Sequence, residues 1–168
     1  MSLLPIVADH LCHAAMAKPA DEADAFGRSA FNRYYYAAFL STRDLLIQID
    51  RSWAHSAHGN IPRILEMDLI KRLRNAVKPL QAKGLVAEGK AKSLICQAGS
   101  AGGDMASILR IAYKVRITAD YMPEEKVIFE PATFRLATHT EAEAKQWLLR
   151  IDRNKGILLN VAKEVGLV

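Results

Sequence analysis

Hydrophobic side chains recur at intervals of three and four residues along most of this chain, and the alternating pattern of β-strands is nearly absent. These intervals place side chains on one face of an α-helix, so the pattern predicts a chain built almost entirely of helices. The predicted helical segments are residues 3–17, residues 21–49, a region that begins at Ile61 and is disturbed at Pro79 and Gly84, residues 87–98, residues 104–122 and a last helix that reaches Val165.

Proline, glycine and capping residues predict where these helices begin and end. Asp21, just after Pro19, is a predicted N-cap for the second helix. The run Gly99–Gly103 predicts a flexible linker, because no strand precedes it and it lacks the Lys-Ser/Thr ending of a phosphate-binding loop. Thr138 and Glu141, and also Thr140 and Glu143, have the spacing of a capping box that would open the last helix.

The strongest hydrophobic stripes lie in residues 21–49 and 104–122. Two such stripes favour an all-α fold: an antiparallel bundle of four to five main helices plus short helices, in a single domain over residues 1–168. Residues 124–139 would form a long connection along this bundle, and we expect no more than a two-stranded piece of sheet. The stripe residues are Phe31, Tyr35, Ala38, Leu45 and Ile49 in the first segment, and Met105, Ile108, Ala112, Val115, Ala119 and Met122 in the second.

The composition is that of a folded protein, with 51% hydrophobic and 24% charged residues. No apolar run reaches the roughly 18–20 residues of a membrane span, and the N-terminus lacks the basic region of a signal peptide. Cys12 and Cys96 are isolated in sequence, which suits a reducing compartment, so we expect a cytoplasmic protein with no membrane partner. The net charge of +5 is compatible with a nucleic-acid partner, but Lys and Arg are spread along the chain, and solvated helix faces explain most of them.

Two histidine pairs have the spacing of metal ligands on a helix, His10 with His13 and His55 with His58. No second cluster of ligands at a fixed spacing supports either pair, so ordinary surface histidines are the favoured interpretation. The sequence therefore predicts no metal and no cofactor.

Arg116 lies at the edge of the second stripe, and Asp120 follows it by one helical turn. Such a pair can be an intrahelical ion pair at the bundle edge, or Asp120 can orient Arg116 toward a phosphate. The spacing alone favours the ion pair.

The aromatic run Tyr34–Tyr36 covers most of the circumference of its helix, so at least one of these tyrosines should be partly exposed. Packing in the core with the hydroxyl at the rim is favoured over stacking on a base. Arg33, in the same helix, would either pair with an acidic residue or line the same groove as Arg116.

The segment Arg28–Phe39 (RSAFNRYYYAAF) and the segment Arg116–Tyr121 (RITADY) together resemble the two signature helices of HEPN domains. The similarity extends from about Arg28 to Ala162. In that family an Arg followed four to six residues later by a His forms a ribonuclease centre. Tyr121 stands at the earliest of these His positions, and a phenol with a pKa near 10 is a poor base at neutral pH.

The resemblance implies a nucleotide- or RNA-interacting protein of a toxin–antitoxin or defence-type system. Arg116 would contact a phosphate, Asp120 would orient it, and Tyr121 or Thr118 would border the site. Arg33 and Tyr35 complete the expected nucleotide- or RNA-binding set. Whether the chain is an enzyme is left open: the absent His makes it a degenerate ribonuclease at most, and any activity would be that of a metal-independent endoribonuclease using Arg116, Asp120 and Tyr121.

Two expectations concern partners. The alternative function is a non-catalytic helical interaction module that docks a nucleotidyltransferase or another protein, in which case Arg116 and Asp120 would be structural. We also expect a symmetric homodimer across the face that carries Arg116, because the resemblance implies a cleft built from two copies. A monomer whose last helix covers that face is the alternative.

Overall fold

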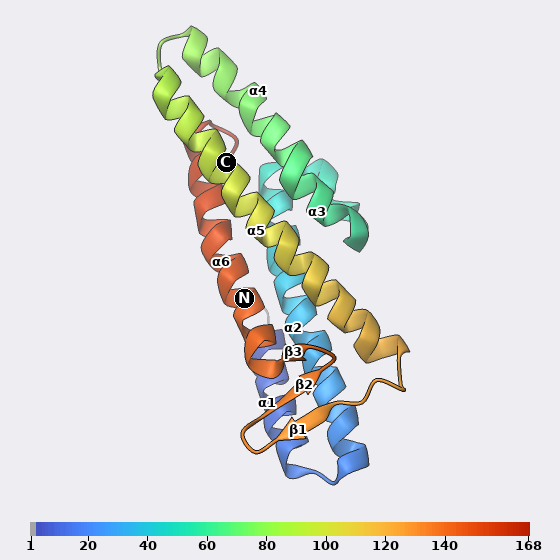
Figure 1. Cartoon of the computed structure of the whole chain (residues 1–168). Helices are drawn as coiled ribbons and strands as arrows, with labels where there is room; N and C mark the ends of the chain where they lie inside the picture. The colour runs from blue at the N-terminus through green and yellow to red at the C-terminus, as the bar shows by residue number, and fades with distance from the viewer. Residues whose placement is uncertain (1–2) are drawn as a thin grey trace. The chain divides into compact units, whose positions relative to one another are not determined.

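The computed structural model describes residues 3–168, apart from the side chain of Asp21. Most of this range is helical, which confirms the predicted helical character of the chain (Figure 1). The predicted cap by the side chain of Asp21 lies outside the described residues, and the second helix begins one residue earlier, at Ala20. The main helices are α1 (Leu4–Ala17), α2 (Ala20–Ile49), α4 (Leu69–Ala82), α5 (Glu88–Tyr121) and α6 (Glu141–Glu164).

Short turns connect α2 to α4. Two 3₁₀ turns, Arg51–His55 and His58–Asn60, lead into α3 (Ile61–Arg63), and the π-helical turn Ile64–Asp68 continues directly into α4. Gly84, at φ +71°, adopts a left-handed backbone conformation just after α4 ends.

The chain divides into two compact units. The first contains residues Met1–Ser41 and Leu109–Arg150, and the second contains Thr42–Ile108 and Ile151–Val168. The helices α2, α5 and α6 each contribute residues to both units.

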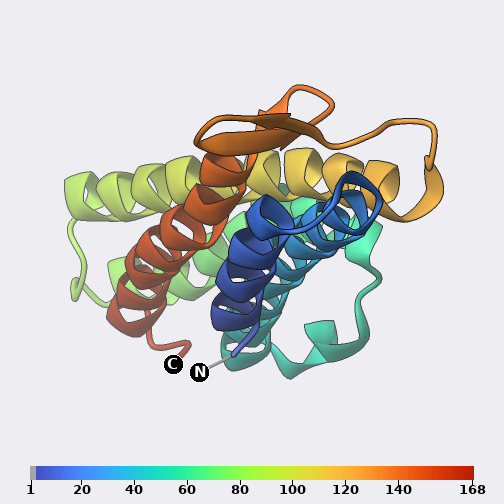
Figure 2. The same ribbon diagram turned by 90° about the horizontal axis from the view of Figure 1, so that it is seen from below.

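In the first unit, α1 lies beside the first half of α2, as Figure 2 shows. The buried hydroxyl of Tyr34 on α2 donates a 2.7 Å hydrogen bond to the Asp9 carboxylate on α1. The sulfur of Cys12 lies 3.5 Å from the same hydroxyl, and Lys145 of α6 forms a 3.0 Å ion pair with Asp9. Polar contacts therefore fix α1 against α2 and α6 within this unit.

The connection between α5 and α6 forms a small antiparallel sheet of β1 (Ile128–Glu130), β2 (Thr133–Leu136) and β3 (His139–Thr140), in that order. The expectation of at most two strands is therefore wrong. The strands are too short for an alternating pattern to be visible in the sequence, and the sheet is stabilised by packing against a helix. The buried ring of Phe134 meets Phe31 of α2 edge-on, with ring centroids 5.8 Å apart.

In the second unit, α4 and the first half of α5 run antiparallel and are joined by a tight turn (Figure 1). The predicted linker at Gly99–Gly103 is wrong, because these residues lie inside the uninterrupted helix α5. A Cβ atom on Gly102 would come within 2.7 Å of the Leu65 carbonyl oxygen. Gly102 therefore lets α5 approach the backbone of the π-helical turn closely, and the glycine is a packing feature rather than a break.

The predicted hydrophobic stripes form the core. Their residues on α2 and α5 are at most 7% exposed, with the exception of Met122 at 39%. The capping box of α6 is confirmed for Thr140 and Glu143, since the backbone N–H of each residue donates to the side-chain oxygen of the other, at 3.0 and 3.2 Å.

Two neighbouring glycines should respond in opposite ways to alanine. We expect Gly102→Ala to lower the free energy of unfolding by about 1–3 kcal/mol, because the added methyl group meets the Leu65 backbone. Gly103→Ala should raise it by roughly 0.5–1 kcal/mol, since its Cβ would meet no other atom within 4 Å and alanine favours the helix. Urea unfolding followed by circular dichroism measures both. Equal effects at the two positions would contradict the close approach at Gly102.

Candidate functional site

The centre of the candidate site is the guanidinium of Arg116, in the last turns of α5. Its Nε lies 2.8 Å from Asp120 Oδ2, and only 17% of the Arg116 side chain is exposed. The ring of Tyr121 lies under the guanidinium, with its centroid 5.2 Å from Cζ. Burial by itself lowers the pKa of Arg116, but Tyr121 and the Asp120 charge more than offset this effect and raise it, so the guanidinium remains charged.

Asn32 of α2 fixes the carboxylate that orients Arg116. Its side-chain amide Nδ2 donates a short hydrogen bond to Asp120 Oδ1, while Arg116 holds the other oxygen of the same carboxylate. Within the described residues, neither the buried Oδ1 atom of Asn32 nor the buried Nε atom of Arg116 has a hydrogen-bond partner, so Arg116 and Asp120 form an ion pair without a hydrogen bond at Nε. Residues from two helices therefore contact the two oxygens of the Asp120 carboxylate. Nothing in the hydrophobic pattern indicates this role for Asn32, because its partner lies 88 residues away.

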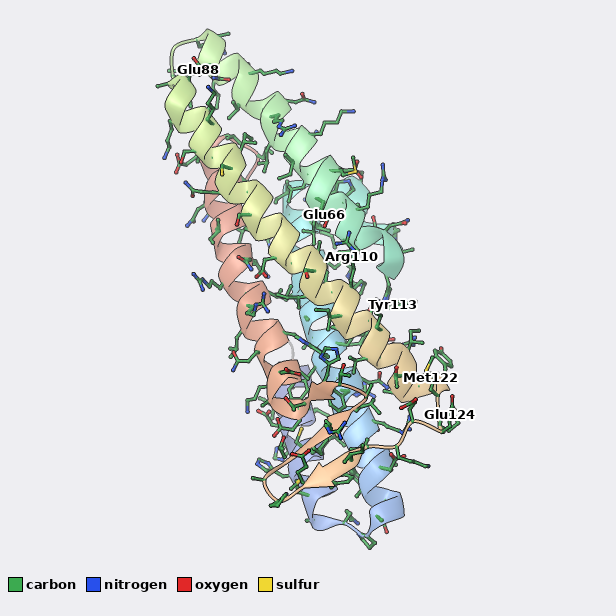
Figure 3. All side chains as sticks on the ribbon, viewed as in Figure 1. Glu66, Glu88, Arg110, Tyr113, Met122 and Glu124 are labelled. Carbon is green, nitrogen blue, oxygen red and sulfur yellow. The ribbon has the colours of Figure 1, made fainter. Side chains whose placement is uncertain are left out.

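Tyrosine rings surround the same part of the first unit. Tyr35 is 2% exposed, and its ring centroid lies 5.1 Å from that of Tyr36 and 5.9 Å from that of Tyr113. Tyr36 is partly exposed, Tyr113 is 39% exposed and Tyr121 is 65% exposed. Figure 3 labels Tyr113 on α5, between Arg110 and Met122. Tyr36, Tyr113 and Tyr121 are therefore at least partly accessible to solvent in the unit that contains Arg116.

The residues expected to bind a nucleotide or RNA differ in their exposure to solvent. Tyr35 is buried, so its ring is a support for Tyr36 and Tyr113 and not an open face for a base. Thr118 is partly exposed, and its hydroxyl donates to the Lys114 carbonyl oxygen at 3.2 Å. Arg33 is exposed on α2. Tyr36 and Tyr113 are the aromatic residues that the sequence interpretation did not single out for the site.

Arg28, the first residue of the signature segment, has a structural role that the sequence did not reveal. Its Nη1 atom donates to the carbonyl oxygens of Thr118 and Ala119 at 3.1 Å each, and its Nη2 atom donates to the carbonyl oxygens of Met122 and Glu125. These carbonyls lie in and just after the last turn of α5, and those of Thr118 and Met122 also accept the backbone N–H groups of Met122 and Glu125. Arg28 therefore caps the helix that carries Arg116.

Asp24 holds Arg28 in place. Its carboxylate accepts hydrogen bonds from Arg28 Nε at 2.9 Å and from the Val127 backbone N–H at 2.8 Å. Burial raises the pKa of Asp24, but the Val127 and Arg28 hydrogen bonds and the Arg28 charge outweigh it, so the pKa lies below the usual aspartate value. The pair Asp24–Arg28 thereby joins α2, the end of α5 and the strand-forming connection.

Among the described residues, the contacts of Arg116 are with Asp120 and tyrosines and include no histidine. His139, the candidate that the fold could have brought near, lies 3.4 Å from Glu143 and packs edge-on against Trp147. Among the described residues, no three His, Cys, Asp or Glu side chains are grouped so that they could hold a metal ion. In the same part of the chain, no helix is both long enough and apolar enough to cross a membrane.

The arrangement can bind an anion and stack a planar group beside it. A guanidinium held by a carboxylate presents its remaining N–H groups in a fixed direction, which suits the geometry of a phosphate. Exposed tyrosine rings next to it can stack on a base. The same residues offer no imidazole for proton transfer.

Comparisons with known proteins identify no relative. The chain matches no protein-family model, and no curated protein or solved structure is significantly similar to it.

The depressed pKa of Asp24 makes part of the stability depend on pH. An unfolded aspartate has a pKa of about 3.9, so the contribution is complete above that pH and is lost as pH falls through the lower folded value. We expect Asp24→Asn to reduce the free energy of unfolding at pH 7 by about 1–3 kcal/mol. Below pH ~4 the variant should lose less stability on further acidification than the wild type does.

Unfolding by urea between pH 2.5 and 7 measures both effects. Asp44→Asn is the matched control, since Asp44 is an exposed aspartate on the same helix. If the two variants had the same pH profile, the proposed role of Asp24 in holding Arg28 would be wrong.

Proposed function

We propose that this chain is a HEPN-like protein that binds RNA or a nucleotide at Arg116, in a toxin–antitoxin or defence-type system. The observation that carries the proposal is the arrangement around Arg116: a guanidinium oriented by Asp120, with the exposed rings of Tyr113 and Tyr121 on the same helix. The family and the type of system rest on the resemblance of the segments Arg28–Phe39 and Arg116–Tyr121 to the HEPN signature helices.

The contacts of Asp120 favour a site over a simple surface ion pair. An exposed pair one turn apart on a helix contributes only about 0.2–0.5 kcal/mol, and it needs no third residue. Here Asn32 from α2 also holds the carboxylate, so the counter-charge of Arg116 is positioned by contacts from two helices. A cation fixed in this way recognises a phosphate at a lower entropic cost than a flexible surface arginine.

The proposal is binding without efficient cleavage. The groups next to Arg116 are Asp120, Tyr121 and Tyr36. A tyrosine hydroxyl is a poor base at neutral pH. The Asp120 carboxylate already contacts Arg116 and Asn32, so it is not available to accept a proton from RNA. If RNA is cut, the reaction is that of a metal-independent endoribonuclease, with Arg116 at the phosphate and Tyr121 near the ribose.

A symmetric homodimer across the Arg116 face remains part of the proposal. Tyr113 lies within about 60° of Arg116 around α5, and the ring of Tyr121 lies under the guanidinium. Both tyrosines are more than a third exposed, so the helix carries apolar surface beside Arg116 that a second copy would cover. Light scattering at tens of micromolar protein tests it, and a monomer at that concentration would count against the dimer.

Binding is tested with a fluorescent single-stranded RNA and with ATP, by anisotropy over a range of salt concentrations. We expect Arg116→Ala to weaken binding about tenfold or more, because a charge-assisted hydrogen bond contributes roughly 1.5–3 kcal/mol. The slope of log affinity against log salt should fall by about 0.7 for each lost phosphate contact. Tyr113→Leu should weaken binding to RNA through lost stacking, worth roughly 1–3 kcal/mol.

Arg153→Ala is the matched control, because it removes one positive charge from an exposed position on α6. Binding by wild type and Arg116→Ala that is equal at low and at high salt would remove the proposal. Incubation with total RNA separates the remaining alternatives: cleavage that Arg116→Ala abolishes would establish a ribonuclease. If neither the wild type nor Tyr121→His cleaves or binds RNA, and the chain instead binds a nucleotidyltransferase, the protein is an interaction module.

A further inference from the structure

An open groove of about 840 Å³ lies in the second unit, between α4 and the first half of α5. Its floor is aliphatic, with Ile70 and Val77 from α4 and Ala91 and Ile95 from α5. Gly99 and Ser100 continue it along α5, and a Cβ atom on Gly99 would meet no other atom within 4 Å. The groove does not involve Arg116 or its neighbours.

The excess positive charge of the chain lies in the sequence segment that supplies every residue lining this groove. Residues 61–100 contain eight Lys and Arg against three Asp and Glu, a net charge of +5, which equals the net charge of the whole chain. Lys and Arg occur along the whole sequence, but acidic residues are fewer than basic ones in this segment, and the rest of the chain has no net charge. Four of the eight cations in this segment form ion pairs with described residues, namely Arg63, Arg72, Lys90 and Lys92.

The cations on the α4 side of the groove have no counter-charge. Arg74 and Lys78 both line it and are exposed, and neither forms an ion pair with any residue in the described part of the chain. The third lining cation, Lys92, is paired with Glu88 at 3.0 Å. Figure 3 labels Glu66 and Glu88, the acidic residues of the groove, which lie toward its two ends.

We propose that this groove docks a partner in the form of an acidic amphipathic helix. Aliphatic side chains of the partner would pack on Ile70, Val77 and Ile95, and its carboxylates would pair with Arg74 and Lys78. The α4 side extends from Glu66 to Gln81, roughly 20 Å, which is the length of about four helical turns. The carboxylates of the partner belong in the central turns, because Glu66 and Glu88 would repel them at the ends.

The lining favours a peptide over a nucleic acid. Sites for single-stranded nucleic acids combine cations with aromatic rings on which bases stack. The residues that line this groove include no Phe, Tyr, Trp or His, and the floor is aliphatic. An amphipathic helix meets both features of the groove, since one face is apolar and its flanks are charged.

The test uses two labelled peptides of about four helical turns each. The first has Leu at helical spacing and Glu on both flanks, and the second is identical except that Lys replaces every Glu. Fluorescence anisotropy measures their binding to the full chain, with a single-stranded RNA as a third probe. We expect the acidic peptide to bind with a dissociation constant in the micromolar range and the basic peptide to bind at least about tenfold more weakly.

Two variants localise the binding. Gly99→Leu places a side chain in the groove and should weaken binding of the acidic peptide about tenfold. Gly103→Leu is the matched control: it lies one turn further on α5, its Cβ position is equally open, and it does not line the groove. The double reversal Arg74→Glu with Lys78→Glu should reverse the preference between the two peptides, and Arg153→Glu should not. Circular dichroism checks that each variant is folded.

Several outcomes would overturn the inference. These are no binding of the acidic peptide at about 1 mM, equal binding of the two peptides, or equal effects of Gly99→Leu and Gly103→Leu. If the charge reversal abolished RNA binding while the acidic peptide did not bind, the groove would be a nucleic-acid surface. If Gly99→Leu converted a dimer to a monomer, the occupant would be a second copy of the chain. Loss of RNA binding by Arg116→Ala would leave the groove proposal unaffected, so the two sites are tested separately.

Discussion

The guanidinium of Arg28 is the contact on which the candidate site depends, because it joins the end of α5 to α2. Arg28 donates to the carbonyl oxygens of Thr118, Ala119 and Met122 at this helix end, from a helix about ninety residues away. The positive charge also interacts favourably with the negative end of the helix dipole. Asp24 keeps this side chain in position and at the same time binds the start of the strand-forming connection. The last turns of α5, which carry Arg116 and Asp120, are therefore anchored to α2.

Local features of the fold were predictable from the sequence, whereas features made by distant residues were not. The buried stripes and the Thr140–Glu143 capping box depend on neighbours three or four residues apart, and they are present. The sheet packs Phe134 against Phe31, and α5 brings Gly102 close to the Leu65 backbone. In each of these cases a local rule was outweighed by a contact far along the chain.

The same distinction holds within the site. Arg116 and Asp120 are one turn apart, so their ion pair follows from the spacing. The roles of Asn32 and Arg28 cannot be inferred from spacing, since their partners are 88 or more residues away. Charge balance also differs between the two surfaces described above. The cation at the centre of the candidate site has its own carboxylate, whereas Arg74 on the groove has none among the described residues, so salt should screen the groove more strongly.

The positions of the two cysteines give the protein a natural site for a spectroscopic reporter. Cys12 is held against the Tyr34 hydroxyl, and burial raises the pKa of its thiol, so little reactive thiolate forms at neutral pH. Cys96 is exposed and lines the groove between α4 and α5. A maleimide dye or spin label added to the unmodified protein should therefore attach to Cys96 first, inside the groove itself. Binding of a partner in the groove would then change the fluorescence emission of the dye or the mobility of the spin label, and no residue has to be substituted for this measurement.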